Sequence, residues 1–144
     1  MSDHFEIAII GAGPGGIGAA TNAAHNGLSH ILIEKSEIAN TIYDYQLKKY
    51  VMAEPSHLPL RAQCRFEAGS REKILEEFKE DLERHAVNCV RGEVSALEKE
   101  GEVFRISYGE TSCTAKHVVM AIGVQGSQRK LGVAGDALPH VSYT

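Results

Sequence analysis

Short uninterrupted apolar runs recur along this chain, and each has the length of one buried strand. The first, Ile7 to Ile10, has the β-branched content of a central parallel strand. Runs of similar character lie at residues 30–33 and 118–122. Between residues 71 and 86 the apolar positions instead recur at helical spacing, which predicts an amphipathic helix. Buried strands combined with amphipathic helices are typical of an α/β protein.

A glycine-rich turn follows the first strand at once. Gly11, Gly13 and Gly16 form the pattern G-x-G-x-x-G within the segment IAIIGAGPGGIGAA. Gly11 allows the tight turn, Gly13 lets a phosphate approach the backbone, and Gly16 lets the helix approach the strand. Pro14 suits the first turn of a helix, which we expect to run to about residue 25, before Asn26-Gly27. The first-turn N–H groups and the helix dipole then favour an anion.

An acidic residue ends the second predicted strand. Glu34 follows the run 30–33, close to the expected ~20 residues after the glycines. A carboxylate there accepts hydrogen bonds from both hydroxyls of an adenosine ribose and repels a 2′-phosphate, which disfavours NADP. Strand, turn, helix, strand and carboxylate together predict a dinucleotide site. The alternatives are a glycine-rich turn without a ligand and a solvated carboxylate at the end of a strand.

The segment from residue 36 to 68 loses apolar periodicity and contains clustered tyrosines. We expect one short helix from Tyr43 to Tyr50, ended by Glu54-Pro55. A connection of this length within a compact domain is usually functional or disordered. It would lie over the carboxyl ends of the strands, where ligands of open α/β sheets bind. The alternative is that its tyrosines only cover the edge of the sheet.

A second helix is predicted from Arg71 to about His85, with Ser70 as its N-cap. Its apolar stripe should pack in the core, opposite a charged and solvated face; the stripe consists of Ile74, Leu75, Phe78, Leu82 and Ala86. The apolar residues from Val87 to Val90 then predict a third parallel strand.

The connection after this strand is the most discriminating feature of the chain. Residues 94–99, 103–108 and 111–115 are predicted as three short strands joined by two-residue turns, which is a β-meander. The run 118–122 is then a fourth buried parallel strand, which ends at Gly123. An ordinary NAD-dehydrogenase half would cross over through another helix, so the meander argues against that class.

Length, charge and composition argue against several further classes of function. A chain of 144 residues has room for one domain with a real core, which we assign to residues 1–144. The net charge of −4 and the dispersion of the 15 basic residues argue against nucleic acid. No run resembles a signal peptide or a membrane span, so we expect a cytoplasmic protein without a membrane partner.

The cysteines and histidines predict neither a disulfide nor a metal site. Cys64, Cys89 and Cys113 are widely separated and form no C-x-x-C pair, so we expect each to be a small buried hydrophobic residue. The 7 histidines lack the spacing of metal ligands.

Together these motifs resemble the FAD-binding half of the pyridine nucleotide-disulfide oxidoreductases, including the thioredoxin-reductase-like flavoproteins. The resemblance covers nearly all of the chain. It rests on GAGPGG at Gly11 to Gly16, the carboxylate of Glu34, the β-meander, and VVMAIG at Val118 to Gly123. The last segment is similar to the family's ATG motif, with Ile122 where threonine is common. The implied fold is a Rossmann-like FAD-binding domain, a parallel sheet with a three-stranded β-meander crossover in a three-layer ββα arrangement.

The resemblance also implies FAD as cofactor, NAD(P)H as electron donor, and a set of binding residues. The glycine loop would hold the pyrophosphate and Glu34 the ribose. Lys35 and Val94 would contact the adenine, the end of the fourth strand would approach the cofactor, and Asn40, Thr41 and Tyr45 would face the flavin. The full set is Gly11, Gly13, Pro14, Gly15, Gly16, Glu34, Lys35, Asn40, Thr41, Tyr45, Val94, Ala121, Ile122 and Gly123. No residue is identified as catalytic.

Two departures from the family pattern limit the implied function. The redox cysteine pair is not visible, so dithiol–disulfide exchange is not supported. A second G-x-G-x-x-G/A and the returning Gly-Asp segment are not visible either. We therefore expect an N-terminal part of a longer reductase, inactive alone, whose partner is the NAD(P)H-binding domain of the same protein. A homodimer is compatible with this interpretation.

The favoured function is an FAD-binding module of an NAD(P)H-dependent flavin oxidoreductase. Hydride would pass from nicotinamide to the flavin and on to an unknown acceptor. The alternatives are an NAD-binding regulatory or dehydrogenase domain, a fragment of a flavin monooxygenase, and a non-catalytic interaction fragment.

Overall fold

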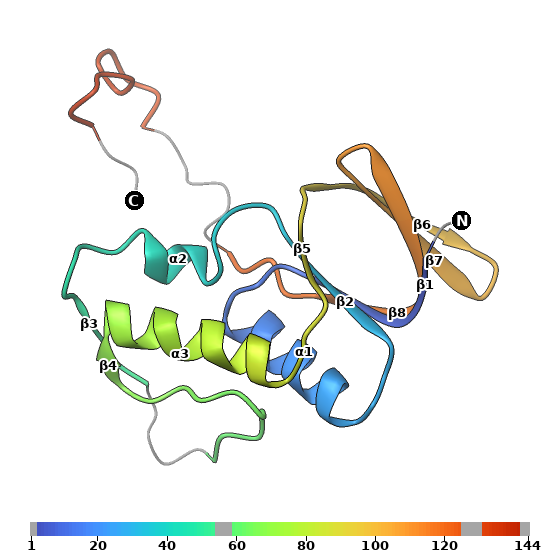
Figure 1. Cartoon of the computed structure of the whole chain (residues 1–144). Coiled ribbons are helices and arrows are strands. Elements are labelled where there is room, and N and C mark those ends of the chain that lie inside the picture. Colours follow the sequence, from blue (N-terminus) through green and yellow to red (C-terminus); the bar gives the residue numbers. More distant parts are fainter. Residues whose placement is uncertain (1–2, 54–58, 125–130, 142–144) are drawn as a thin grey trace.

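The computed structural model describes residues 3–53, 59–124 and 131–141 (Figure 1). None of the helices in these ranges is long and apolar enough to cross a bilayer. The elements in chain order are β1 (His4–Ile10), α1 (Pro14–His25), β2 (His30–Glu34), α2 (Asn40–Tyr43), β3 (Tyr50–Val51), β4 (Gly69–Ser70), α3 (Arg71–Arg84), β5 (Cys89–Arg91), β6 (Val94–Glu100), β7 (Val103–Tyr108) and β8 (Thr111–Met120).

Six strands form one sheet in the order β5-β2-β1-β8-β7-β6, and β3 pairs with β4 in a separate two-stranded sheet. The pairs β5–β2, β2–β1 and β1–β8 are parallel, whereas β6, β7 and β8 form an antiparallel meander. The chain leaves β1 toward β2 on one side and returns to it as β8 on the other. Ligands of open α/β sheets bind at the carboxyl ends of strands at such a switch point. The predicted α/β class is confirmed.

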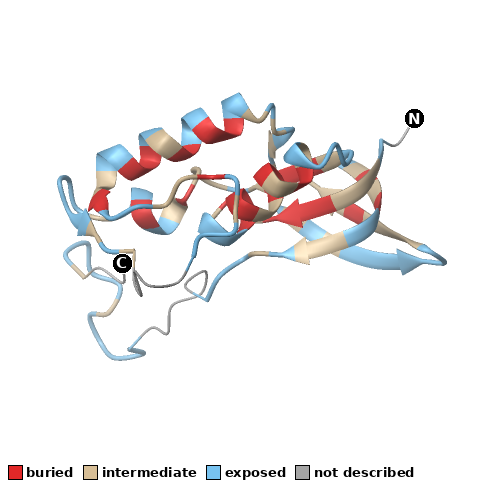
Figure 2. Cartoon of the chain, turned by 90° about the horizontal axis from the view of Figure 1, so that it is seen from below, coloured by how far each residue is buried: buried red, intermediate tan, exposed pale blue. Residues whose placement is uncertain are grey.

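Two clusters of buried side chains lie against the parallel strands. Ile9 and Leu32 belong to one cluster, together with Ile17 of α1 and Phe78 of α3. The second cluster joins alternate residues of the same strands to the meander; it contains Ala8, Ile10, Ile31, Ile33, Ile106, Cys113 and Ala115. Because neighbouring residues of a strand point to opposite faces, the helices cover one face and the meander packs against the other (Figure 1). Figure 2 shows the buried residues concentrated on the strands and on the helix faces turned toward them.

The fourth parallel strand and the last meander strand are one element, so the prediction of two strands, 111–115 and 118–122, was wrong. Strand β8 runs without a break from Thr111 to Met120. Its first half pairs antiparallel with β7, and residues from Thr114 onward pair parallel with β1. The two residues between the predicted strands, Lys116 and His117, belong to β8 and are exposed.

The short helix predicted from Tyr43 to Tyr50 was also misplaced. Helix α2 ends at Tyr43, whose carbonyl accepts a hydrogen bond of 2.9 Å from Nε of Arg71. A left-handed residue, Lys48 with φ of 63°, lies further along the segment where the helix was expected. The Glu54-Pro55 pair that predicted the helix end lies outside the described residues.

The two longer helices, α1 and α3, have nearly the bounds that the sequence predicts. Helix α1 begins at Pro14 and ends at His25, with Asn26 as its C-cap. Helix α3 begins after Ser70, whose hydroxyl accepts a hydrogen bond of 3.3 Å from the backbone N–H of Lys73. The third parallel strand, β5, begins two residues later than predicted, at Cys89.

The cysteine predictions are confirmed at two positions out of three. Cys64 and Cys113 are buried, and burial raises the pKa of both thiols. Cys89 is exposed on β5, which lies at the edge of the sheet. Within the described residues, no group of three histidine, cysteine or acidic side chains is placed to hold a metal ion.

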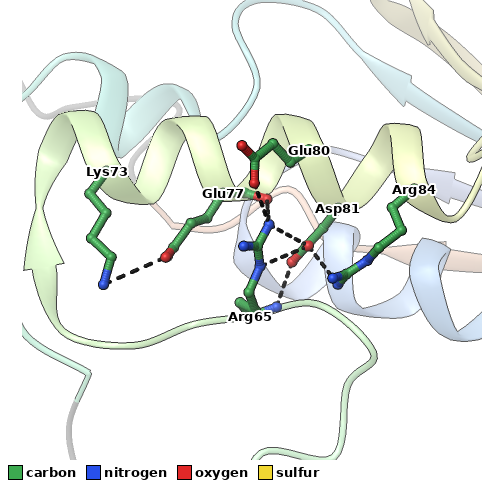
Figure 3. A network of polar contacts seen from close by, with 6 residues as sticks. All are labelled: Arg65, Lys73, Glu77, Glu80, Asp81 and Arg84. Carbon is green, nitrogen blue, oxygen red and sulfur yellow. Dashed lines mark hydrogen bonds and ion pairs between the residues drawn. The ribbon is translucent and has the colours of Figure 1, made fainter.

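One buried carboxylate fixes the segment that precedes β4 to helix α3 (Figure 3). The Asp81 side chain is fully buried and accepts hydrogen bonds from the backbone N–H of Arg65 at 2.6 Å and from its Nε at 3.0 Å. Arg84 donates a third bond, 2.7 Å long. Arg65 also binds Glu80 at 2.7 Å. The charged contacts therefore hold this segment against α3.

We expect the Asp81→Asn variant to lose about 2–4 kcal/mol of folding free energy at neutral pH, because it leaves two arginines without their shared carboxylate. Burial raises the pKa of Asp81, but the hydrogen bonds and charges of Arg65 and Arg84 outweigh it and hold this pKa below its usual value. The stabilisation is therefore complete above pH ~4 and is lost as the pH falls through the folded-state pKa.

Urea denaturation at pH 7 and at pH values below 4 tests this expectation. The difference between wild type and Asp81→Asn should be largest at pH 7 and should shrink in acid. Glu83→Gln is the control, since Glu83 is an exposed carboxylate on the same helix. Equal stability of Asp81→Asn and Glu83→Gln at pH 7 would show that the buried network contributes nothing.

Candidate functional site

The glycine loop between β1 and α1 is tightly packed at two of its glycines. Gly11 has a φ of +98°, and its N–H donates to the carbonyl of Ile33 at 2.8 Å. A Cβ on Gly11 would lie 2.5 Å from the carbonyl oxygen of Ala121. A Cβ on Gly16 would lie 1.8 Å from the carbonyl oxygen of Gly11. These two glycines allow the close contact among β1, α1 and the end of β8.

The other two glycines of the loop face open space. A Cβ on Gly13 or Gly15 would meet no other atom within 4 Å. Gly13 is the N-cap of α1, and within the described residues this N-cap makes no side-chain cap hydrogen bond. Pro14 occupies the first helical position and is exposed. The helix N-terminus therefore offers backbone N–H groups and the positive end of its dipole to an anion.

The Glu34 carboxylate lies against this loop. One oxygen, Oε2, accepts a hydrogen bond of 2.7 Å from the N–H of Ala12, and Oε1 accepts one of 2.8 Å from Ser36. Each carboxylate oxygen has a further lone pair, so both can still accept bonds from a ligand. The contact with Ala12 was not predicted. The register between β1 and β2 explains this contact, because parallel pairing of Ile10 with Ile33 places Glu34 beside Gly11.

The end of β5 lies next to Glu34. The N–H of Gly92 donates to the Glu34 carbonyl at 2.9 Å, which brings the start of β6 at Val94 to the same edge. Val94 is half-buried and packs with the meander-side core. The Nζ of Lys35 lies 3.9 Å from Oε1 of Glu93. The predicted adenine contacts, Lys35 and Val94, thus lie on neighbouring segments.

The start of α2 also reaches the glycine loop. Ala39, a left-handed residue with φ of 53°, donates from its N–H to the carbonyl of Ala12 at 2.8 Å. The next residue, Asn40, bonds to Asp44 at 2.9 Å, and Thr41 is exposed. Tyr45 instead packs against the helix-side core. The described contacts therefore bring the beginning of α2 to the loop, while Tyr45 packs in the core cluster that also contains Ala12.

The residues after β8 also lie at the carboxyl end of β1. Ala121 donates from its N–H to the carbonyl of Ile10 at 2.8 Å, which places it beside Gly11. Ile122 is 62% exposed, and Gly123 has a φ of +65°. The loop, Glu34, the start of α2 and the end of β8 are thus joined by contacts around the carboxyl end of β1. Such an edge can hold a phosphate at the helix and hydroxyl groups at the carboxylate.

Known proteins share this fold and parts of this sequence. The ferredoxin–NADP reductase of Ignicoccus hospitalis is 29% identical over 139 residues, which are 94% of this chain and 42% of that protein. The bacillithiol disulfide reductase Bdr of Staphylococcus aureus has a TM-score of 0.79 and 24% identity, covering 95% of this chain and 44% of that one. A flavin-containing monooxygenase from Stenotrophomonas maltophilia has a TM-score of 0.71 and 18% identity, covering 88% of this chain and 41% of that one.

These comparisons differ in what they show. The chain spans less than half the length of the reductases it matches. The likeness to Bdr and to the monooxygenase, below 25% identity, shows the fold alone. The family model for pyridine nucleotide-disulphide oxidoreductases, in contrast, matches residues 8–144, which are nearly all of the sequence. The chain belongs to the pyridine nucleotide-disulphide oxidoreductase family.

Proposed function

We propose that this chain binds FAD as the flavin-binding part of an NAD(P)H-dependent oxidoreductase. The observation that carries the proposal is the Glu34 carboxylate, held 2.7 Å from the Ala12 N–H beside a helix N-terminus that has no side-chain cap among the described residues. This places a hydroxyl acceptor and a phosphate-binding helix end on one loop. An adenosine diphosphate group presents hydroxyls and phosphates in that order.

Each part of the site has a separate task in this proposal. The N–H groups at the start of α1 bind the pyrophosphate in the open space at Gly13 and Gly15. The free lone pairs of Glu34 accept bonds from the two ribose hydroxyls. Lys35 and Val94 flank the adenine, and Ala121, Ile122 and Gly123 approach the cofactor from β8. Asn40, Thr41 and Tyr45 are proposed for the flavin side, with Tyr45 the least supported because it packs in the core.

The choice of FAD over NAD rests on the crossover and the family. The meander β6-β7-β8 takes the place of the crossover helix of an ordinary NAD-binding half. The family match and the reductases that resemble this chain favour a flavin reductase over a monooxygenase, because the monooxygenase shares the fold at only 18% identity. When bound, a flavin accepts hydride from a reduced nicotinamide and passes electrons to an acceptor. The acceptor and the NAD(P)H site belong to the whole protein.

The test is the identity of the bound nucleotide. We expect the purified protein to bind FAD in preference to FMN and NADP, because the site has a pyrophosphate cradle and a carboxylate at the ribose. Ligand released by heat is separated by chromatography, and ligand-free protein is titrated with each nucleotide by flavin fluorescence or calorimetry. FMN or NADP as the main released species, or as the tightest ligand, would contradict the proposal.

A further inference from the structure

Four charged residues lie on two segments, one that follows Glu34 and one that contains its ladder partner, Arg91. Lys35 and Glu37 follow β2, while Arg91 ends β5 and Glu93 comes shortly after it. They form two ion pairs that cross between the segments. Nζ of Lys35 lies 3.9 Å from Oε1 of Glu93, and Nη1 of Arg91 lies 3.5 Å from Oε1 of Glu37. Each cation therefore has an acidic partner on the neighbouring segment.

Both cations belong to residues that neighbour Glu34 in the strand ladder or along the chain. Arg91 is the direct pairing partner of Glu34 in the parallel ladder between β2 and β5. Paired residues of neighbouring strands project from the same face of a sheet. Lys35 is the next residue along the chain. An arginine near this position is the group that accommodates the 2′-phosphate of NADP in dinucleotide-binding folds.

We infer that Glu37 and Glu93 are specificity-determining residues that engage Arg91 and Lys35 and so keep both cations from a ligand's 2′-phosphate. Rejection of 2′-phosphorylated dinucleotides then depends on three carboxylates. Glu34 repels the phosphate, and Glu37 and Glu93 pair with the cations that would otherwise attract it. This inference rests on the proposed function, because it requires a dinucleotide whose ribose lies at Glu34.

The exposure of these pairs makes the inference testable without loss of the fold. The four side chains are 43% to 77% exposed, so the pairs contribute little to stability. Replacing both acids by glutamine keeps the size of the side chains and releases two cations. Screened charges at a surface are worth a fraction of a kcal/mol each, so we expect a gain of about threefold to tenfold in affinity for a 2′-phosphate.

The experiment compares NAD⁺ and NADP⁺, which differ only in the 2′-phosphate. Calorimetry is used to titrate FAD, NAD⁺ and NADP⁺ into ligand-free wild type and the Glu37→Gln/Glu93→Gln variant. We expect the affinity for NADP⁺ relative to NAD⁺ to rise about threefold to tenfold in the variant, and this gain to disappear at high salt. Glu100→Gln is the control, because Glu100 pairs with Arg105 at 2.7 Å on the β6–β7 hairpin.

The outcomes separate this inference from the proposed function. Wild type that binds FAD or NAD⁺ would overturn the inference alone if the double variant shows no gain in NADP⁺ binding relative to NAD⁺, including the case in which neither protein binds NADP⁺ measurably. An equal gain in Glu100→Gln would overturn it too, because the effect would then reflect net charge. Wild type that binds none of the three nucleotides would contradict the proposed function and with it this inference.

Discussion

The Gly16→Ala variant is expected to lose about 3 kcal/mol of folding free energy or more, although alanine is the better helix former. Its Cβ would lie 1.8 Å from the Gly11 carbonyl oxygen, a backbone atom that cannot rotate away. The neighbouring Cβ of Ala121, at 3.3 Å, closes the other direction. Relief of the clash would require α1 to move away from β1.

Gly15→Ala is the matched control. It adds the same methyl group one residue earlier in the same helix, where nothing lies within 4 Å. We expect its stability to equal or slightly exceed that of wild type, because glycine is a poor helix residue. Urea denaturation followed by far-UV circular dichroism measures both variants. Coincident unfolding curves for Gly16→Ala and Gly15→Ala would show that the close packing of the loop is unimportant.

The Glu34→Ala variant is expected to bind FAD about tenfold to a thousandfold more weakly than wild type. Two charge-assisted hydrogen bonds to the ribose, each worth ~1.5–3 kcal/mol, would be lost, and water would replace part of this loss. The variant also removes the acceptor of the Ala12 N–H, which holds the glycine loop. The loss of the ribose bonds and the loss of the Ala12 contact both weaken the binding of FAD.

Glu34→Gln separates these two effects. The amide oxygen can keep the bond from Ala12, while the amide nitrogen can accept a bond neither from the Ser36 N–H nor from a ribose hydroxyl. An intermediate loss in Glu34→Gln is therefore expected if the carboxylate both holds the loop and binds the ribose. Flavin fluorescence quenching measures the affinities, with Glu100→Ala as a carboxylate control away from the site. If Glu34→Ala binds FAD as tightly as wild type, Glu34 is not part of the site.

Local signals predicted the parts of the structure in which neighbours along the chain decide the geometry. Helix α3 begins at Arg71 with Ser70 as its N-cap, as predicted, because the N-cap bond reaches only three residues ahead. The glycine loop and Glu34 were placed on strand and helix ends because a βαβ unit of ~30 residues fixes their relation. The roles of these residues toward a ligand stay predictions that binding experiments must test.

Long-range contacts explain the elements that sequence reasoning misplaced. The expected helix from Tyr43 to Tyr50 is absent from the described structure: helix α2 ends at Tyr43, whose carbonyl accepts a bond from Arg71, 28 residues away. The sequence analysis divided β8 into residues 111–115 and 118–122, whereas one continuous strand changes its partner from β7 to β1. In both places the missing information was which distant segment supplies the hydrogen bonds.

The double pairing of β8 affects how the chain folds as it is synthesised. Strand β1 can pair with β2 early, but its other edge is filled only by β8, and His4 contacts Thr114, 110 positions later. At about 5–20 residues per second, that edge remains open for roughly 5–20 s on the ribosome. An apolar strand with an unpaired edge is a template for another chain. The interval before β8 emerges is therefore the period in which the nascent protein is most exposed to aggregation and most dependent on chaperones.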